Sequence, residues 1–183
     1  MTRVYYKQDF VGMSQLEIEM WIKFNYQRLI GSAIFTKSNS VVSKIVQWAE
    51  RWRNKEDRFV PSHTGSLVEK NGYIYIMDVK PPKNTVQPLS YYLAYTEEDY
   101  AIVMRDFDID TKLFSLNILE RVGEWYPIMS AVRSVFTKRK TAYKSHCSEH
   151  HARTLQRLGY EFPKEFNLEC TPDELFQYFI NKD

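Results

Sequence analysis

Apolar side chains recur at helical spacing near the start of the chain. Leu16, Met20 and Phe24 follow one another every four residues, and Ser14 stands before them as a residue type that caps helices. Side chains four residues apart lie on the same side of a helix. The pattern therefore predicts a leading scaffold helix from Ser14 to about Leu29, with these three apolar residues along one stripe.

Two further elements are predicted before residue 60. The apolar run from Gly31 to Thr36 is short, which is typical of a buried strand. Ser38-Asn39-Ser40 then forms a turn that caps a second helix. The apolar residues of that helix are Val41, Val42, Ile45, Val46, Trp48, Ala49 and Trp52.

A β-hairpin is predicted after Ser62. Residues 63–70 and 73–80 flank Asn71-Gly72, the dipeptide best suited to a two-residue type I′ turn. Pro81-Pro82 ends the second strand, because proline cannot donate a hydrogen bond to a sheet. Counting outward from the turn pairs Lys70 with Tyr73 and Gly65 with Asp78.

The second half of the chain adds a strand and three helices to the prediction. The strand covers residues 100–105, and a helix runs from about Asp110 to Val122. Another helix runs from Cys147 to Gly159, and Thr171-Pro172 begins a last short helix with a capping residue and a proline at its first position. Helices, then several antiparallel strands, then helices predict the α+β fold class, with a central antiparallel sheet packed against helices.

Length and composition fit one domain. A chain of 183 residues can bury a single core, so we predict one domain over residues 1–183. Two cysteines are too few for a disulfide framework, which favours a reducing compartment. The sequence shows no signal-peptide pattern and no uncharged stretch of about 18 residues, so we expect a cytoplasmic or soluble intracellular protein without stable membrane insertion. A formal charge of +2 gives no indication of a nucleic acid partner, and nothing indicates the oligomeric state.

Cys147 stands at the start of a predicted helix, where unpaired N–H groups and the helix dipole favour a thiolate. A cysteine nucleophile needs a base, and His63 at the start of the hairpin is the candidate. Cys147 shares a helical stripe with His151, Leu155 and Leu158, so we expect its sulfur to face the sheet. The backbone N–H of Cys147 is one candidate oxyanion donor.

The hairpin register selects an acid to orient His63. Asp78 lies opposite Gly65, and residues two apart on a strand share a face, so Asp78 is a diagonal neighbour of His63. Glu69 shares that face but lies about 20 Å further along the strand. We therefore predict that Asp78 accepts a hydrogen bond from the imidazole and supports its charged form. Gly65 is expected to leave the space beside Asp78 clear.

A zinc site is the competing chemistry around Cys147. His146 and His150 have the i, i+4 spacing of two ligands on one helical face, and His151 follows. His146 and His151 point in different directions, however, and the sequence has no second cluster of cysteine or histidine. We therefore predict no metal and no cofactor, with His150 at the surface and His146 lining the cleft.

Four short segments resemble, in this order, one family of hydrolases. They are Gly31 to Ser40, Ser62-His63-Thr64-Gly65, His146-Cys147-Ser148-Glu149 and Thr171-Pro172-Asp173-Glu174-Leu175. Together they resemble the permuted papain-like amidases of the YiiX and YaeF type, a circularly permuted branch of the NlpC-like cysteine hydrolases related to the lecithin:retinol acyltransferases. The family's usual Gly-Asp is Gly31-Ser32 here, and its frequent glutamate is Asp78.

The resemblance implies a circularly permuted papain-like (NlpC-like) fold, with residues 1–30 as a leading helical segment and residues 31–183 as the catalytic core. It implies that Cys147 is the nucleophile, His63 the base and Asp78 the polar third member of a triad. The residues expected to line the cleft or bind substrate are Ser38, Asn39, Tyr143 and His146. Substrates in such families include amide bonds of cell-wall peptides and ester or amide bonds of lipids.

Three functions follow as hypotheses. A cysteine hydrolase, amidase or peptidase, would cleave an amide or ester bond through a thioester on Cys147. An acyltransferase or other lipid-directed thioester enzyme would pass the acyl group to an amine or alcohol, which requires a drier site. A non-catalytic binding domain on the same scaffold would use the aromatic-rich segment from Pro88 to Tyr100 as a contact surface. The set of Cys147, His63 and Asp78 argues against the binding domain, and the hydrolase is the leading hypothesis.

Overall fold

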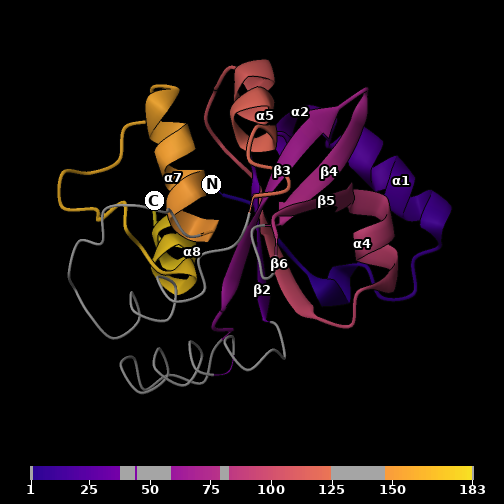
Figure 1. The fold of residues 1–183 in the computed structure, drawn as a ribbon. Coiled ribbons are helices and arrows are strands. Elements are labelled where there is room, and N and C mark those ends of the chain that lie inside the picture. The colour runs from indigo at the N-terminus through magenta and orange to yellow at the C-terminus, as the bar shows by residue number, and fades with distance from the viewer. Residues whose placement is uncertain (1, 38–43, 45–58, 79–82, 125–146, 183) are drawn as a thin grey trace.

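A computed structural model describes residues 2–37, 44, 59–78, 83–124 and 147–182. They form a mixed α+β fold around a six-stranded antiparallel sheet with the strand order β1-β6-β2-β3-β4-β5 (Figure 1). The strands are β1 (Val4–Tyr6), β2 (Ala33–Lys37), β3 (His63–Lys70), β4 (Tyr73–Asp78), β5 (Thr85–Pro88) and β6 (Asp99–Val103).

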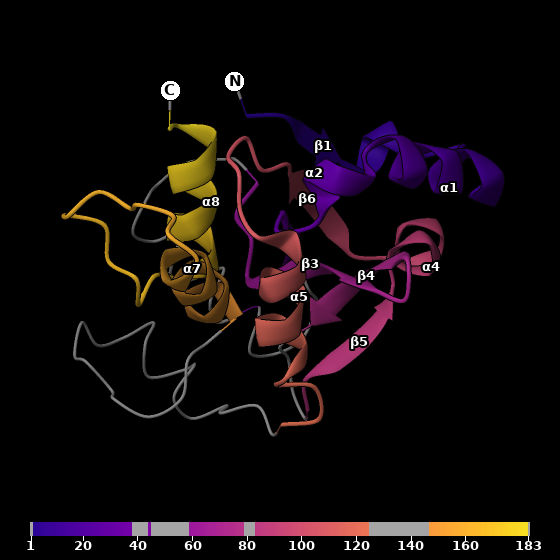
Figure 2. The same ribbon diagram turned by 90° about the horizontal axis from the view of Figure 1, so that it is seen from above.

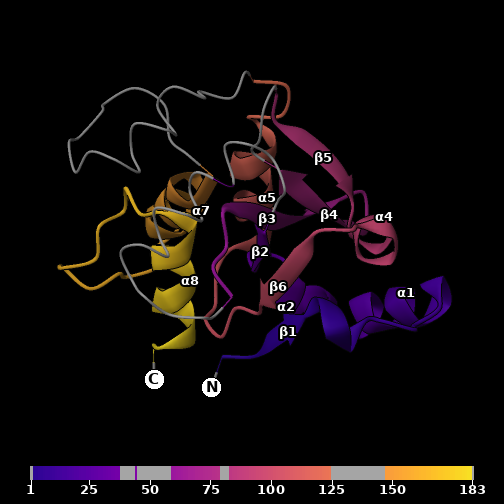
Figure 3. The same ribbon diagram turned by 90° about the horizontal axis from the view of Figure 1, so that it is seen from below.

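Helices cover both faces of the sheet (Figures 1 and 3). One face carries α1 (Gln15–Phe24), α2 (Tyr26–Leu29) and α4 (Leu89–Tyr95), and the other carries α5 (Thr111–Leu119), α7 (Cys147–Arg157) and α8 (Pro172–Ile180). A short 3-10 helix, η1 (Lys7–Asp9), follows β1. Because side chains alternate along a strand, neighbouring residues of β3 enter different cores: Leu67 packs toward α1 and α4, and Val68 toward α7 and α8.

The structure confirms the predicted hairpin and its register. Asn71 and Gly72 have φ values of 53° and 81°, as a type I′ turn requires, and Gly65 pairs with Asp78. The expectation of clear space at Gly65 is wrong. A Cβ atom there would come within 2.9 Å of side-chain atoms of Ile34 and Ile76, so the glycine lets these two side chains pack over the backbone.

The structure confirms the leading helix and its Ser14 cap, but the predicted apolar stripe does not face the core and the helix ends earlier than predicted. Leu16, Met20 and Phe24 are 66%, 62% and 92% exposed, whereas Ile18 is buried against the sheet. The sequence carries two overlapping apolar stripes, and the one through Ile18 faces the core. The helix also ends at Phe24, because Asn25 donates its side-chain amide to the Trp21 carbonyl and α2 begins anew.

Other predicted elements agree with the structure to within a few residues. The predicted strands over 31–36 and 100–105 are β2 and β6, and the predicted helix after Asp110 is α5, which Asp110 caps through Leu113 N–H. Thr171 caps α8 and exchanges hydrogen bonds with Glu174. Of the predicted second helix, residues 41–52, only Lys44 is described, and it is helical and exposed; the other residues lie outside the described part of the chain. Elements that were not predicted are β1, η1, β5 and α4.

The residues after β6 connect distant parts of the chain. Arg105 donates to the carbonyls of Gln27, Ile30 and Phe107 at 2.5–2.6 Å, which fastens the leading segment to the sheet. Asp106 accepts a hydrogen bond from Thr2 and forms an ion pair with Lys182. Thr2 and the end of α8 therefore lie near each other, and Figure 2 shows the N- and C-terminal ends side by side.

Candidate active site

His63 and Asp78 form a buried pair at one end of the hairpin. His63 is the first residue of β3, opposite Thr36 of β2, and Asp78 is the last residue of β4. Their side chains are buried, and Nε2 of His63 is hydrogen-bonded to Oδ1 of Asp78. The diagonal placement predicted from the register is therefore present. Glu69 is instead engaged at the turn, where its carboxylate accepts the N–H of Gly72.

Cys147 lies against the same histidine. It is the first residue of α7, is 4% exposed, and belongs to the core between α7 and the sheet. The thiol is hydrogen-bonded to the imidazole of His63. Because Asp78 occupies Nε2, the ring nitrogen that remains for Cys147 is Nδ1. The three side chains thus form one chain of hydrogen bonds from sulfur to carboxylate.

The contact depends on where the elements begin. By strand alternation, His63 and Asp78 share the face of Leu67, toward α1 and α4, while α7 packs on the opposite face. Cys147 reaches His63 because α7 starts beside the first residues of β3. The backbone N–H groups of Thr64 and Ser148 also donate to the sulfur, so strand and helix both hold it.

The pKa values of His63 and Cys147 are shifted in opposite directions. Burial lowers the pKa of His63, but the charges of Asp78 and Cys147 and their hydrogen bonds outweigh it and raise the pKa to about 10. Burial raises the pKa of Cys147, but the His63 charge, its hydrogen bond and the two N–H groups bring the pKa below that of an ordinary thiol. A thiolate and an imidazolium can therefore coexist near neutral pH.

Ser148 fastens the start of α7 to the start of α8. Its hydroxyl donates to the carbonyl of Cys170 at 2.5 Å, and Thr171, the cap of α8, follows directly. Cys170 is also a free, buried cysteine. Burial and the charge of Glu174 raise the pKa of Cys170, so this second thiol stays protonated.

The histidines that follow Cys147 are buried, which corrects the prediction of His150 at the surface. Nδ1 of His150 lies 3.4 Å from Nη1 of Arg121. His150 is buried, and burial lowers its pKa to about 4. His151 is fully buried, its Nδ1 lies 2.8 Å from Oγ of Ser66, and burial lowers its pKa to about 3. Within the described residues, no group of three or more His, Cys, Asp or Glu side chains is placed to hold a metal ion.

Three of the predicted site residues are brought together, namely Cys147, His63 and Asp78. The four predicted cleft residues, Ser38, Asn39, Tyr143 and His146, lie outside the described residues. Thr64 and Ser148, whose N–H groups meet the sulfur, were not predicted as site residues. Ser148 could have been suspected from its place beside Cys147, but the Thr64 contact is made by its backbone and has no sequence signal.

No protein-family model matches this chain, and the comparison with curated proteins finds no match. Over the described residues, none of the helices has the length and apolar character needed to span a membrane.

Proposed function

We propose that the protein is a cysteine hydrolase that cleaves an amide or ester bond through a thioester on Cys147. The observation that carries the proposal is the buried hydrogen-bonded chain of Cys147, His63 and Asp78, with a lowered thiol pKa and a raised imidazole pKa. Such a pair supplies a nucleophile and a proton donor at the same pH. Asp78 orients the ring and stabilises its charged form.

The proposed reaction has two steps. The thiolate of Cys147 attacks the carbonyl carbon, and His63 gives its proton to the leaving amine or alcohol as the bond to the carbonyl breaks. Neutral His63 then takes a proton from water, which attacks the thioester and releases the acid and the thiolate. The N–H of Cys147 at the helix start is the proposed donor to the oxyanion.

The proposed fold is the circularly permuted papain-like arrangement, in which a histidine begins one strand, its polar partner stands on the next, and the cysteine begins a helix. The antiparallel sheet and the positions of His63, Asp78 and Cys147 on β3, β4 and α7 support this proposal. The proposed substrate is an acyl compound of the peptide, cell-wall or lipid type, which carries an amide or ester bond.

Acyl transfer is the second candidate, and the burial of the site favours it. Cys147, His63 and Asp78 are 4%, 6% and 1% exposed, so little water reaches them in this state. A thioester shielded from water survives long enough to meet an amine or alcohol. Both candidates use the same first step and differ in what accepts the acyl group.

The proposal is tested by trapping the thioester. The protein is mixed with p-nitrophenyl butyrate and with acyl-peptide amides, and intact-mass spectrometry follows the acyl adduct over time. We expect one adduct, on Cys147, which is lost in Cys147→Ala and slowed in His63→Ala. Cys170→Ala is the matched control, since it removes the other buried cysteine, and it should acylate normally.

The fate of the adduct separates the candidates. Decay in water at a rate unaffected by added glycinamide supports hydrolysis, and faster decay with formation of the acylated amine supports transfer. Adducts on Cys170 or on surface lysines, with equal rates in His63→Ala, would reject both and leave a binding domain.

A further inference from the structure

Two buried hydroxyl groups beside His63 have no hydrogen-bond partner among the described residues. They are Oγ1 of Thr36 and Oγ1 of Thr64. Thr36 pairs with His63 across β2 and β3, and Thr64 follows His63 along β3. A buried hydroxyl without a partner is uncommon, because the group has given up its hydrogen bonds to water and gained none in return. A catalytic role is one of the reasons for which a protein keeps such a group.

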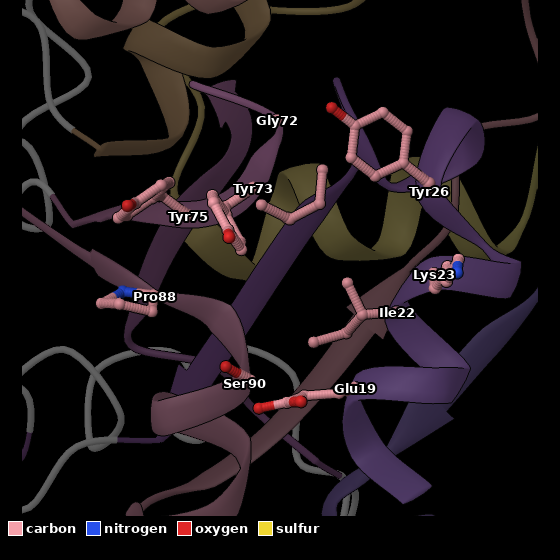
Figure 4. A pocket seen from close by; sticks show the side chains of 10 residues that line it. Glu19, Ile22, Lys23, Tyr26, Gly72, Tyr73, Tyr75, Pro88 and Ser90 are labelled. Carbon is pink, nitrogen blue, oxygen red and sulfur yellow. The ribbon is translucent and has the colours of Figure 1, made fainter. Parts of the chain in front are cut away.

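The pocket shown in Figure 4 lacks groups of this kind. It has a volume of about 570 Å³ and lies at the turn end of the hairpin, between β4 and the helices α1, α2 and α4. Of the described residues that line it, none has a buried side-chain polar atom without a partner. His63 and Thr64 lie at the other end of the same hairpin. The two unpaired threonine hydroxyls therefore belong to the surroundings of the candidate active site and not to this pocket.

The side chain of Thr64 faces the first turn of α7. Ser66, two residues further along β3, lies against His151 of α7, with 2.8 Å between Oγ and Nδ1. Two residues of a strand span about 6.6 Å and share a face, and four residues of a helix span about 6 Å and share a face. Because β3 and α7 begin side by side, stepping back from this contact places Thr64 opposite Cys147.

The backbone of Thr64 is already in contact with the sulfur, since its N–H donates to Cys147. The hydroxyl of the same residue is three bonds away from that nitrogen, yet it does not bond to the sulfur in the resting state. It is thus a donor that stands beside the nucleophile and is not used there. An interaction that is absent in the resting state and forms only in the transition state lowers the barrier of the chemical step.

We propose that Thr64 is a catalytic residue whose hydroxyl donates a second hydrogen bond to the oxyanion formed when Cys147 attacks a carbonyl. This inference rests on the proposed function, in which the N–H of Cys147 is the first donor. As the carbon–sulfur bond forms, the carbonyl π electrons move onto oxygen, and the two donors stabilise that charge. The electrons return when the leaving group departs, and Thr64 keeps its proton throughout. Thr36 shares the face of His63, away from α7, and has no such role.

The test compares two reactions of the same sulfur in the full chain. Acylation by p-nitrophenyl butyrate passes through an oxyanion, whereas alkylation by iodoacetamide displaces iodide and forms none. Thr64→Val replaces the hydroxyl by a methyl group of similar size. We expect it to lower the acylation rate about 10²-fold, as loss of one oxyanion donor does in a serine protease, and to leave the alkylation rate and its pH dependence unchanged.

Two further variants serve as controls. Thr64→Ser keeps a hydroxyl at the same place and should acylate at nearly the wild-type rate. Thr36→Val removes the other unpaired hydroxyl and should acylate normally. If Thr64→Val does not fold, Thr64→Ala and Thr64→Ser give the same comparison, because they differ from each other only by the hydroxyl.

Equal acylation of Thr64→Val and the wild type would overturn the proposal. An equal loss of acylation and alkylation would also overturn it, because Thr64 would then only support the thiolate. The wild type separates this inference from the proposed function. If the wild type forms no acyl adduct on Cys147, the proposed function fails and the role of Thr64 fails with it. If the wild type acylates and Thr64→Val acylates equally fast, only the role of Thr64 is rejected.

Discussion

Asp78 accepts the hydrogen bond of His63 from the neighbouring strand, although fifteen residues separate them in sequence. The bond uses Nε2, so the carboxylate fixes which nitrogen faces Cys147. Asp78→Asn keeps the shape of the side chain but removes the charge that stabilises the imidazolium.

We expect Asp78→Asn to lower the acylation rate of Cys147 strongly. The loss is about 10⁴ for the corresponding change in a serine protease, and it should be smaller here because a thiol needs less assistance. Glu69→Gln is the control, since Glu69 caps the turn at the far end of the hairpin. If Asp78→Asn and Glu69→Gln are both folded and acylate Cys147 at equal rates, Asp78 does not take part in the reaction.

The pH dependence of Cys147 alkylation should report the ion pair. The thiolate forms as the pH rises through the lowered pKa of Cys147, so iodoacetamide should react fully at pH values where an ordinary thiol is protonated. The rate should change again only near pH 10, where His63 loses its proton.

In His63→Ala, burial still raises the pKa of Cys147 but the histidine charge that lowers it is gone. The rise of the Cys147 alkylation rate should therefore occur at higher pH than in the wild type. Cys170 is an internal control, because the pKa of its thiol is raised and it should react slowly throughout. Peptide mapping after alkylation measures both sites. Faster modification of Cys170 than of Cys147 would contradict this assignment.

Gly65→Ala should destabilise the fold through packing. The added methyl group would come within 2.9 Å of Ile34 and Ile76, an overpacking that costs about 1–3 kcal/mol. Ile76→Val shortens one of the two neighbours and should recover part of the loss in the double variant. Urea unfolding of the four proteins gives the coupling energy, and additive effects would show that the contact with Ile76 is unimportant.

His151 should make the protein less stable in acid. Its pKa is about 3 when folded and near 6.5 when unfolded, so below pH 6.5 the unfolded chain binds a proton that the folded chain does not. Between pH 7 and pH 5 this should remove about 2 kcal/mol of unfolding free energy. His151→Gln should show a correspondingly smaller drop in urea unfolding, and an unchanged drop would refute the effect.

The two stripes of α1 should differ in their effect on stability. Ile18→Ala removes a buried side chain and should cost about 2–5 kcal/mol, whereas Phe24→Ser changes an exposed one and should stay within about 0.5 kcal/mol. Thermal unfolding compares them. A large loss in Phe24→Ser would show that the Leu16, Met20 and Phe24 stripe is covered in solution.

The elements that could be predicted from sequence have local causes. Asn71-Gly72 determines both the turn and the pairing of Gly65 with Asp78, and Thr171-Pro172 determines where α8 begins. Such signals act within a few residues. The choice between the stripes of α1 has no local cause, because both have helical spacing and only packing against the sheet distinguishes them.

The candidate site could be predicted only in part for the same reason. The diagonal contact of His63 with Asp78 follows from counting along the hairpin. That Cys147 reaches His63 from the other face of the sheet does not, because it depends on where α7 begins relative to β3. Leu89 to Tyr95 was missed as a helix because its tyrosines and the preceding Pro88 gave no clear period.

The contacts of Asp106 have a consequence for the order of the chain. Thr2 and Lys182 both meet this carboxylate, so a short glycine linker could join the two ends and new ends could be opened in an exposed turn such as that at Gly123, after α5. The sheet, and the meeting of Cys147 with His63, would be unaffected. Which of the two comes first along the polypeptide is therefore a matter of gene order, and the chemistry of the folded molecule does not depend on it.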